Sequence, residues 1–192
     1  MRNILVTIVG HDRPGIIHQV SKALADLNCT VVEVSQTTLM GEFAGHFSCH
    51  LPLDVKVEDF CELFDQALAG SGLARWITEA EFNPSGGKTV TETEPYVVTV
   101  RGKDRAGIIP GFSGAMAGFD VNIDNLRSVT FTEDGQAVEE SGDKKVVLFF
   151  ELSVPRAVNQ RGLRQALSII AEDMDLEMSL QHRDIFEAMH RV

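Results

Sequence analysis

The apolar positions of the chain repeat one succession of strands and helices in its two halves. Residues 4–9 and 96–100 are short, almost continuous apolar runs of the kind that form buried strands. Each run is followed by apolar positions at helical spacing, which predict a helix with one buried stripe. The two stripes match position by position at an offset of 92 residues: Ile16, Val20, Ala23, Leu24 and Leu27 against Ile108, Phe112, Ala115, Met116 and Phe119. The pattern therefore predicts a duplicated domain.

The remaining elements complete the same order in each half. A second helix carries its own apolar stripe, made of Phe60, Leu63, Phe64, Ala67 and Leu68 in the first half and of Leu163, Ala166, Leu167, Ile170 and Ala171 in the second. Extended stretches lie between the helices, and a last strand is expected at 74–82 and at 177–185. The order βαββαβ predicts an α+β fold of two ferredoxin-like domains, each an antiparallel sheet with both helices on one face. We expect the opposite face of each sheet to be exposed.

The repeat also sets the expected domain boundaries. Matching positions of the two halves are 92 residues apart at first and 103 residues apart further along the chain. The difference predicts an insertion in the second half, at the acidic, polar stretch near 132–145. A stretch rich in Gly, Ser, Thr and Glu at 83–94 has no apolar periodicity and is predicted to be a linker. The domains are therefore expected at 1–82 and 95–192. The insertion is expected to form a mobile hairpin extension with no core of its own.

Acidic residues outnumber basic ones, and this balance argues against several classes of function. Asp and Glu number 28 and Lys and Arg 17, so the formal net charge is −11. Phosphate binding needs clustered basic residues, so we expect no direct binding of nucleic acid or of a membrane surface. No apolar run is long enough to span a bilayer, and the first residues do not resemble a signal peptide, so we expect a cytoplasmic protein. Arg101 and Lys103 either attract an anionic ligand or pair with acidic side chains.

No residue pattern points to catalysis or to a bound cofactor. The chain lacks the usual sequence signatures of serine hydrolases, nucleotide-binding enzymes and zinc proteases. Cys29 and Cys49 align with apolar residues of the other half, which favours core positions over a catalytic thiol. His46 and His50 alternate along one strand and could hold a metal, but no third ligand supports such a site. We therefore expect no enzyme activity, no metal and no cofactor.

The loop between the first strand and the first helix is closely similar in the two halves, with GHDRPGII at 10–17 and GKDRAGII at 102–109. Gly15 and Gly107 permit a close backbone approach and would leave N–H groups at a helix start free for an anion, naturally a carboxylate. The alternative is that Asp12 or Asp104 only caps the helix. Because most exposed positions differ between the halves, retention of the motif favours a ligand or interface role.

These motifs resemble those of tandem ACT domains, small regulatory modules that commonly bind amino acids. The resemblance rests on the two loop motifs together with NCTVVEV at 28–34 and DVNIDNL at 120–126. It implies a ligand site lined by the first loop and the start of the second strand, where two domains abut. The residues implied are Asp12, Arg13, Pro14, Gly15 and Ile16 in the first half and Asp104, Arg105, Gly107, Ile108 and Asn122 in the second. Thr30 and Ala106 depart from the family pattern, so the two sites can differ in affinity.

The resemblance also implies a function. Two ACT domains without a catalytic domain resemble transcriptional regulators of glycine cleavage or related amino-acid metabolism that act through a DNA-binding partner. We therefore expect a regulatory protein that binds a small amino acid (glycine or a serine-like one), contacts a protein partner and forms a homodimer or higher oligomer. One alternative is a regulatory subunit or remnant of an enzyme of amino-acid or one-carbon metabolism, of the formyltetrahydrofolate deformylase or phosphoserine phosphatase type. The other is a structural oligomerisation module.

Overall fold

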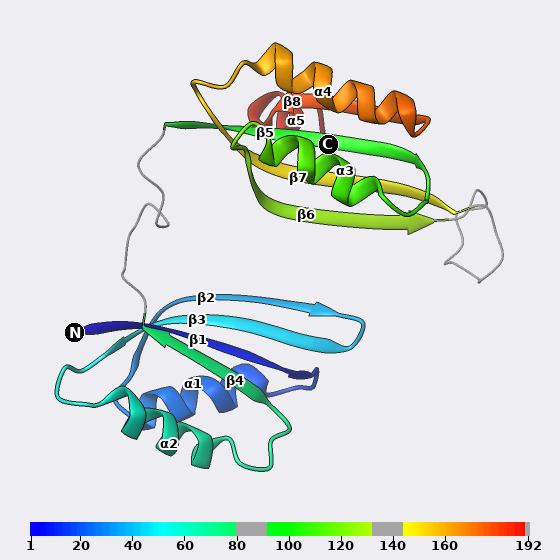
Figure 1. Cartoon of the computed structure of the whole chain (residues 1–192). Coiled ribbons are helices and arrows are strands. Elements are labelled where there is room, and N and C mark those ends of the chain that lie inside the picture. The colour runs from blue at the N-terminus through cyan, green and yellow to red at the C-terminus, as the bar shows by residue number, and fades with distance from the viewer. Residues whose placement is uncertain (80–91, 132–143, 191–192) are drawn as a thin grey trace. The chain divides into compact units, whose positions relative to one another are not determined.

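The structure, a computed structural model, describes residues 1–79, 92–131 and 144–190. The chain divides into two compact units, Met1–Gly87 and Lys88–Val192, and Figure 1 shows a sheet covered by helices in each of them. Most of the predicted linker at 83–94 lies outside the described residues, but Thr93 and Glu94 already belong to a strand of the second unit. The predicted insertion at 132–143 lies wholly outside them.

The first unit has the predicted βαββαβ order. Its elements are β1 (Arg2–His11), α1 (Ile16–Asp26), β2 (Thr30–Leu39), β3 (Glu42–Leu51), α2 (Val57–Ala67) and β4 (Ala74–Glu79). The strands form an antiparallel sheet in the order β2-β3-β1-β4. Because β1 is an inner strand, the loop that follows it starts near the middle of one end of the sheet and not beside an edge strand.

The second unit repeats this order and adds one helix. Its elements are β5 (Thr93–Lys103), α3 (Ile108–Ala117), β6 (Asn122–Phe131), β7 (Lys145–Pro155), α4 (Gln160–Asp173), β8 (Leu176–His182) and α5 (Arg183–His190). The antiparallel sheet has the corresponding strand order, β6-β7-β5-β8. The prediction of an α+β fold with two ferredoxin-like units is therefore confirmed.

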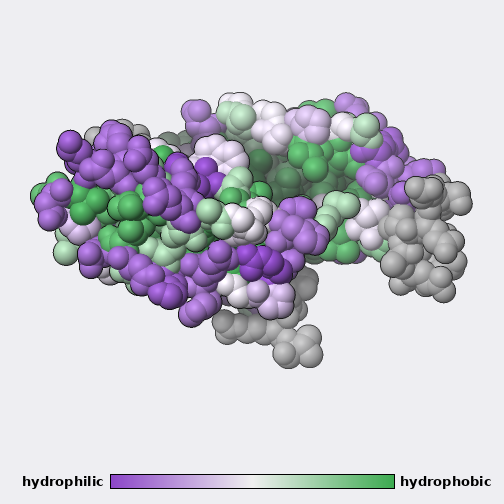
Figure 2. Space-filling view, turned by 90° about the horizontal axis from the view of Figure 1, so that it is seen from below, coloured by the Kyte–Doolittle hydropathy of each residue, from purple (hydrophilic) through white to green (hydrophobic). Residues whose placement is uncertain are grey.

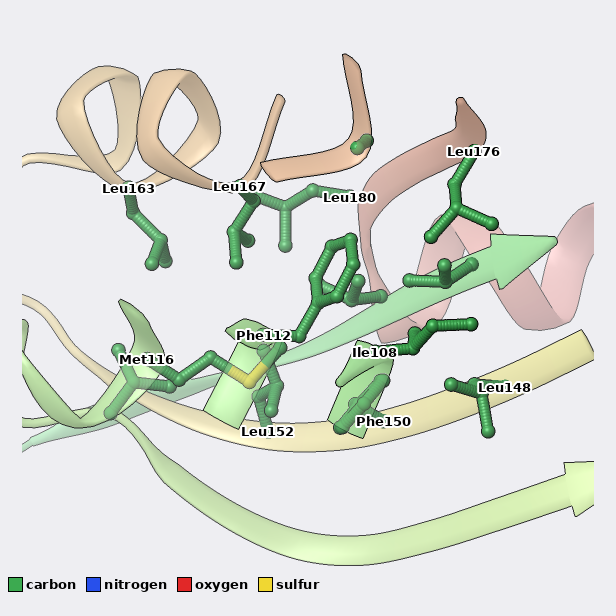
Figure 3. Close-up of a cluster of buried hydrophobic side chains, with 14 of the residues drawn as sticks. Ile108, Phe112, Met116, Leu148, Phe150, Leu152, Leu163, Leu167, Leu176 and Leu180 are labelled. Atoms are coloured by element: carbon green, nitrogen blue, oxygen red, sulfur yellow. The ribbon is translucent and has the colours of Figure 1, made fainter. Parts of the chain in front are cut away.

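Each unit has its own apolar core between one face of its sheet and two helices. In the second unit the alternation along β7 turns Leu148, Phe150 and Leu152 toward the helices, and none of the three is more than 1% exposed. Figure 3 shows Leu163 and Leu167 of α4 reaching into the same cluster, beside Phe112, Ile108 and Met116 of α3. The first unit buries the equivalent set: Ile4, Val6, Ile8, Ile16, Val20, Leu24, Phe43, Phe47, Leu51, Phe60 and Phe64. The helical stripes thus place both helices on one face, as predicted.

Helix α5 overturns two expectations for the second unit. The last strand was expected to run to residue 185, but β8 ends at His182 and a helix begins at Arg183. The final β5–β8 pair is Tyr96 with His182, and the next residue of β5 is Pro95, which has no N–H to extend the ladder. Helix α5 lies against the sheet face opposite α3 and α4, where the ring of Phe186 packs edge-on against Phe149. That face is therefore partly covered in the second unit, and the expectation that it is bare was wrong.

Two positions of the predicted second-helix stripe in the first unit, Leu63 and Ala67, are also wrong, because both residues are exposed. Leu63 is 48% exposed, whereas Phe60, Phe64 and Leu68, spaced at full helical turns, form the buried line of α2. In the face of the molecule seen in Figure 2, hydrophobic residues form patches bordered by hydrophilic ones.

None of the helices in the described part of the chain is long and apolar enough to cross a membrane.

Candidate functional site

The loop after β1 is held by backbone geometry at both of its ends. At its start the Asp12 N–H donates to the Gly41 carbonyl at 2.7 Å, which joins the loop to the β2–β3 hairpin. At its end Gly15 has φ 92° and ψ 0°, a left-handed conformation that favours glycine, and α1 begins at the next residue. Ile16, only 2% exposed, then anchors the helix start in the core.

The loop after β5 has the same construction. The Asp104 N–H donates to the Lys144 carbonyl at 2.7 Å, at the equivalent end of the β6–β7 hairpin. Gly107 has φ 97° and ψ −9°, and α3 begins at Ile108, which is 3% exposed. The two loops therefore share their backbone conformation as well as their sequence.

Neither aspartate caps its helix. Within the part of the chain that the structure describes, no side chain hydrogen bonds to the first turn of α1 or of α3, and neither first turn contains an acidic residue. The Asp12 carboxylate instead accepts a hydrogen bond from Thr38, with 3.4 Å between Oδ2 and Oγ1. The first N–H groups of both helices therefore keep their hydrogen-bonding capacity and the positive end of the helix dipole, which suit an anion.

The arginines of the two loops differ in their contacts. Arg13 donates from Nη2 to Gln19 Oε1 at 2.7 Å and to the Ser71 carbonyl at 3.4 Å, which holds its guanidinium against the first unit. Arg105 has no side-chain partner within the described residues. Pro14 and Ala106 occupy the same exposed position beside them. Among the described residues, Arg105 is therefore the loop arginine that has no contact to give up when it binds a ligand carboxylate.

Packing explains the first glycine of the repeated motif. A Cβ atom on Gly10 would lie 2.8 Å from Leu73 Cδ2, and one on Gly102 would lie 2.5 Å from Leu176 Cδ2. The strands β1 and β5 therefore need glycine where the leucine of the neighbouring segment crosses them. This part of the sequence similarity between the halves reflects core packing and not ligand binding.

Asn122, predicted to belong to the ligand site, lies far from the loop of its own unit. It pairs with Ser153 near the end of β7, whereas the 104–107 loop follows Lys103, which pairs with Lys145 at the start of that strand. Lys145 and Ser153 are eight positions apart on β7, which corresponds to about 26 Å at the usual rise of a strand. The Asn122 side chain also donates to Asp124 at 2.6 Å. The structure therefore brings the loop residues together with one another but not with Asn122.

The candidate histidines contact neighbouring polar side chains, and the candidate cysteines Cys29 and Cys49 lie in the core. His46 Nδ1 lies 3.0 Å from Thr7 Oγ1, and His50 Nδ1 lies 2.7 Å from Asn3 Oδ1. Cys29 and Cys49 are buried in the first core as free thiols, as predicted. Within the described residues, no group of three or more His, Cys, Asp or Glu side chains is placed to hold a metal ion.

Three hollows in the second unit were not found by sequence reasoning. One of about 730 Å³ lies near the loop end of the sheet and includes Arg101, Lys103 and Lys145 together with acidic residues of α4 and β8. The other two, of about 660 and 450 Å³, lie on either side of α5, and both include Phe149 and Phe186. The signal available in the sequence was the apolar pair Ile185 and Phe186 at the end of the chain. Ile185 was attributed to the last predicted strand at 177–185, whereas both residues belong to α5.

Comparison with known proteins places the chain in a family. A family model for the ACT domain matches residues 2–46. A UPF0237 protein of Methanopyrus kandleri is 35% identical over 96 residues, which is 50% of this chain and 96% of that protein. A UPF0237 protein of Listeria monocytogenes is 40% identical over 72 residues, 38% of this chain and 76% of that protein.

Solved structures show the same fold over both units. A protein of unknown function from Galdieria sulphuraria superposes with a TM-score of 0.77 at 22% identity, over 94% of this chain and 98% of that one. A putative glycine cleavage system transcriptional repressor superposes with a TM-score of 0.63 at 17% identity, over 94% and 96% of the two chains. The duplicated βαββαβ fold, the ACT-domain match and the identity to the Methanopyrus protein together show that the chain belongs to the UPF0237 family of ACT-domain proteins.

Proposed function

We propose that this protein is a non-catalytic regulator that senses a small amino acid at the loops before α1 and α3. The observation that carries the proposal is the pair of uncapped helix starts, each preceded by a left-handed glycine, in two units whose other exposed positions differ. The N–H groups of each first turn would receive the ligand carboxylate. In the second unit, the guanidinium of Arg105, which has no partner among the described residues, would add a charged hydrogen bond.

The sites at the two loops would differ in their affinity for the ligand. Arg13 is already bound to Gln19 and Ser71, so a ligand at the first loop would have to compete with these contacts. The second loop therefore gives the stronger site in this proposal. Because Asn122 lies at the other end of its own sheet, it cannot join the site at the loop of its own unit. We also propose a homodimer or higher oligomer, in which a second copy of the chain can supply Asn122.

The acidic surface favours a protein partner over direct contact with nucleic acid. A net charge of −11 would repel phosphates. We propose that the amino-acid signal passes to a partner protein, and that the regulated process is glycine cleavage or a related step of amino-acid metabolism. The resemblance of the two-domain arrangement to regulators of that process supports this part of the proposal.

Titration calorimetry of the full chain with glycine and L-serine tests the loop site. Gly107→Val adds a β-branched side chain to a left-handed position and should weaken binding at the second loop by about tenfold or more, equivalent to about 1.4 kcal/mol. Gly15→Val should do the same at the first loop. Asn122→Ala should weaken binding by about 0.5–1.5 kcal/mol if its amide contacts the ligand in an oligomer.

Circular dichroism of each variant is the control for folding. Unchanged affinity in both folded glycine variants would contradict the loop site. Co-purification of the chain with an enzyme of one-carbon or amino-acid metabolism, without amino-acid binding, would instead support the regulatory-subunit alternative.

A further inference from the structure

A hollow between β5, β8 and α5 is lined by an unusual set of polar side chains. Its volume is about 660 Å³, and it lies on the sheet face away from the main core. Side chains of two neighbouring strands form its floor, and two phenylalanines flank it. The residues that line it are Thr99, Arg101, Phe149, Glu177, Met178, Ser179, Gln181 and Phe186. The first unit has no counterpart of α5 among its described elements.

The strand register arranges the polar side chains in rows. Arg101 faces Glu177, and two residues further along the strands Thr99 faces Ser179. Facing residues on antiparallel strands have Cβ atoms about 4.5–5.5 Å apart. Successive rows on one face are about 7 Å apart, because each residue advances a strand by about 3.4 Å. The hollow therefore presents a pair of opposite charges and, about 7 Å away, a pair of hydroxyl groups.

These groups have no hydrogen-bond or ion-pair partner within the described part of the chain. This holds for the side chains of Thr99, Arg101, Glu177 and Ser179. Thr99 is 9% exposed, which makes it the only polar residue in the buried class among the described residues. The Thr99 hydroxyl is not among the buried polar atoms that lack a partner, so it remains accessible to a ligand in the hollow.

The end of the hollow under α5 shows the same lack of internal partners. The Oε1 atom of Gln181 is buried and accepts no hydrogen bond from the described residues. Leaving such an acceptor unpaired costs about 1–3 kcal/mol. The carboxamide oxygen of this lining residue is therefore a further polar group of the hollow that lacks a partner among the described residues.

We propose that this hollow is a second ligand site, separate from the two loops, that binds an α-amino acid with a neutral amide side chain, such as L-glutamine. Arg101 would bind the α-carboxylate and Glu177 the α-ammonium group, because an α-amino acid carries its opposite charges side by side as these two residues do. The side-chain amide would lie about 7 Å along the strands, where the Thr99 and Ser179 hydroxyls donate and accept hydrogen bonds. Phe149 and Phe186 would pack against the methylene groups.

The chain offers a matched pair of arginines for the test. Arg101 lines the proposed site, whereas Arg127 lies on the same sheet face but lines the hollow on the other side of α5. Titration calorimetry of the full chain should detect binding of L-glutamine. In the Gly15→Val, Gly107→Val double variant, which lacks the loop sites, glycine should bind more weakly than L-glutamine because it has no side-chain amide. Arg101→Gln should weaken L-glutamine binding at least tenfold, and Arg127→Gln should leave it unchanged. Thr99→Val, which removes a hydroxyl at nearly constant volume, should weaken it several-fold.

Amide chemical shifts in NMR spectra locate the ligand independently of any variant. L-Glutamine should shift the resonances of Thr99 and Ser179 in wild-type protein, and should still do so in the Gly15→Val, Gly107→Val double variant. The proposal is overturned if wild-type protein does not bind L-glutamine at millimolar concentration. It is also overturned if Arg101→Gln and Arg127→Gln bind equally well, or if binding survives in Arg101→Gln and is lost in the double glycine variant.

Discussion

Arg183 Nη2 lies 3.3 Å from Glu151 Oε2, and this ion pair joins the first turn of α5 to β7. The other carboxylate oxygen of Glu151 accepts a hydrogen bond from Asn125 on β6 at 3.1 Å, so one carboxylate links three elements. Together with the ring contact between Phe149 and Phe186, this pair holds the helix on the sheet. The position of α5, and with it the hollows on its two sides, therefore depends on a few contacts.

Loss of the ion pair between Arg183 and Glu151 should lower the stability of the second unit slightly. Both side chains of the Arg183–Glu151 pair are 35% exposed, so solvent screens their attraction, and Arg183→Gln should lower the free energy of unfolding by only about 0.5–1 kcal/mol. Urea denaturation measures this change. The control is Lys22→Gln, which removes an exposed pair with Asp26 on α1 and should cost less. Equal effects of the two substitutions would show that Arg183 does not anchor α5.

The left-handed glycine before α3 should resist substitution for conformational reasons alone. A Cβ atom on Gly107 would meet only Met174 Cε, at 3.6 Å, so there is room for it. Gly107→Ala should still destabilise the protein by about 1–2 kcal/mol because φ is 97°. Gly114→Ala, inside α3 with open space around it, should instead stabilise the protein by about 0.5–1 kcal/mol. Thermal unfolding of both variants tests the contrast, and a stabilising Gly107→Ala would contradict it.

The ion pair between α2 and β4 should make stability depend on pH in the acid range. Arg75 donates to both carboxylate oxygens of Asp65, at 2.6 Å from Nε to Oδ1, and these hydrogen bonds hold the pKa of the Asp65 carboxyl below its ordinary value. A lowered pKa in the folded state contributes stability above the ordinary pKa, and this contribution is lost as the pH falls through the lowered value.

Asp65→Asn should therefore reduce stability at pH 7, and the difference from wild type should vanish once the pH has fallen below the lowered pKa of Asp65. Chemical denaturation across this range measures it, with Asp26→Asn as a control for an exposed pair within one helix. A difference between wild type and Asp65→Asn that persists at the lowest pH would show that the pair does not act through its charge.

The three thiols should react at very different rates. Cys49 shares a hydrogen bond with Cys29 and is buried, and both effects raise the pKa of the Cys49 thiol, so the reactive thiolate is scarce there. Cys61 on α2 is only partly buried. At pH 8, iodoacetamide should label Cys61 in the native protein and the other two only after unfolding, as mass spectrometry would show. Native Cys61→Ser should then take up no label, and rapid labelling of Cys49 would contradict its burial.

The acidic segment at 132–143, which lies outside the described residues, should be dispensable for folding. It is too polar to form a core of its own, and a shorter loop costs less entropy to close. Replacing it with a short turn that contains glycine should leave the circular dichroism spectrum and melting temperature nearly unchanged. A large loss of stability would show that the segment packs against the second unit.

The sequence by itself determined the duplicated fold. The stripes that begin at Ile16 and Ile108 are local periodicities, and burial of one face of a helix or strand leaves such a pattern within a short window of the chain. The loop glycines could be found for the same reason, because a left-handed residue before a helix favours glycine wherever it occurs. The repeated motif therefore identified the loops, although it did not show that Gly10 and Gly102 serve packing against Leu73 and Leu176.

Only the tertiary structure decided which distant residues become neighbours. Asn122 follows α3 closely in sequence, yet strand register places it at the far end of the sheet from the 104–107 loop. Arg101 and Glu177 face each other across two strands that are far apart in sequence, and α5 crosses the sheet because pairing along β8 stops opposite Pro95. The register of paired strands and the path of α5 over the sheet depend on contacts between segments that are far apart in sequence. Such contacts leave no periodic pattern in either segment alone.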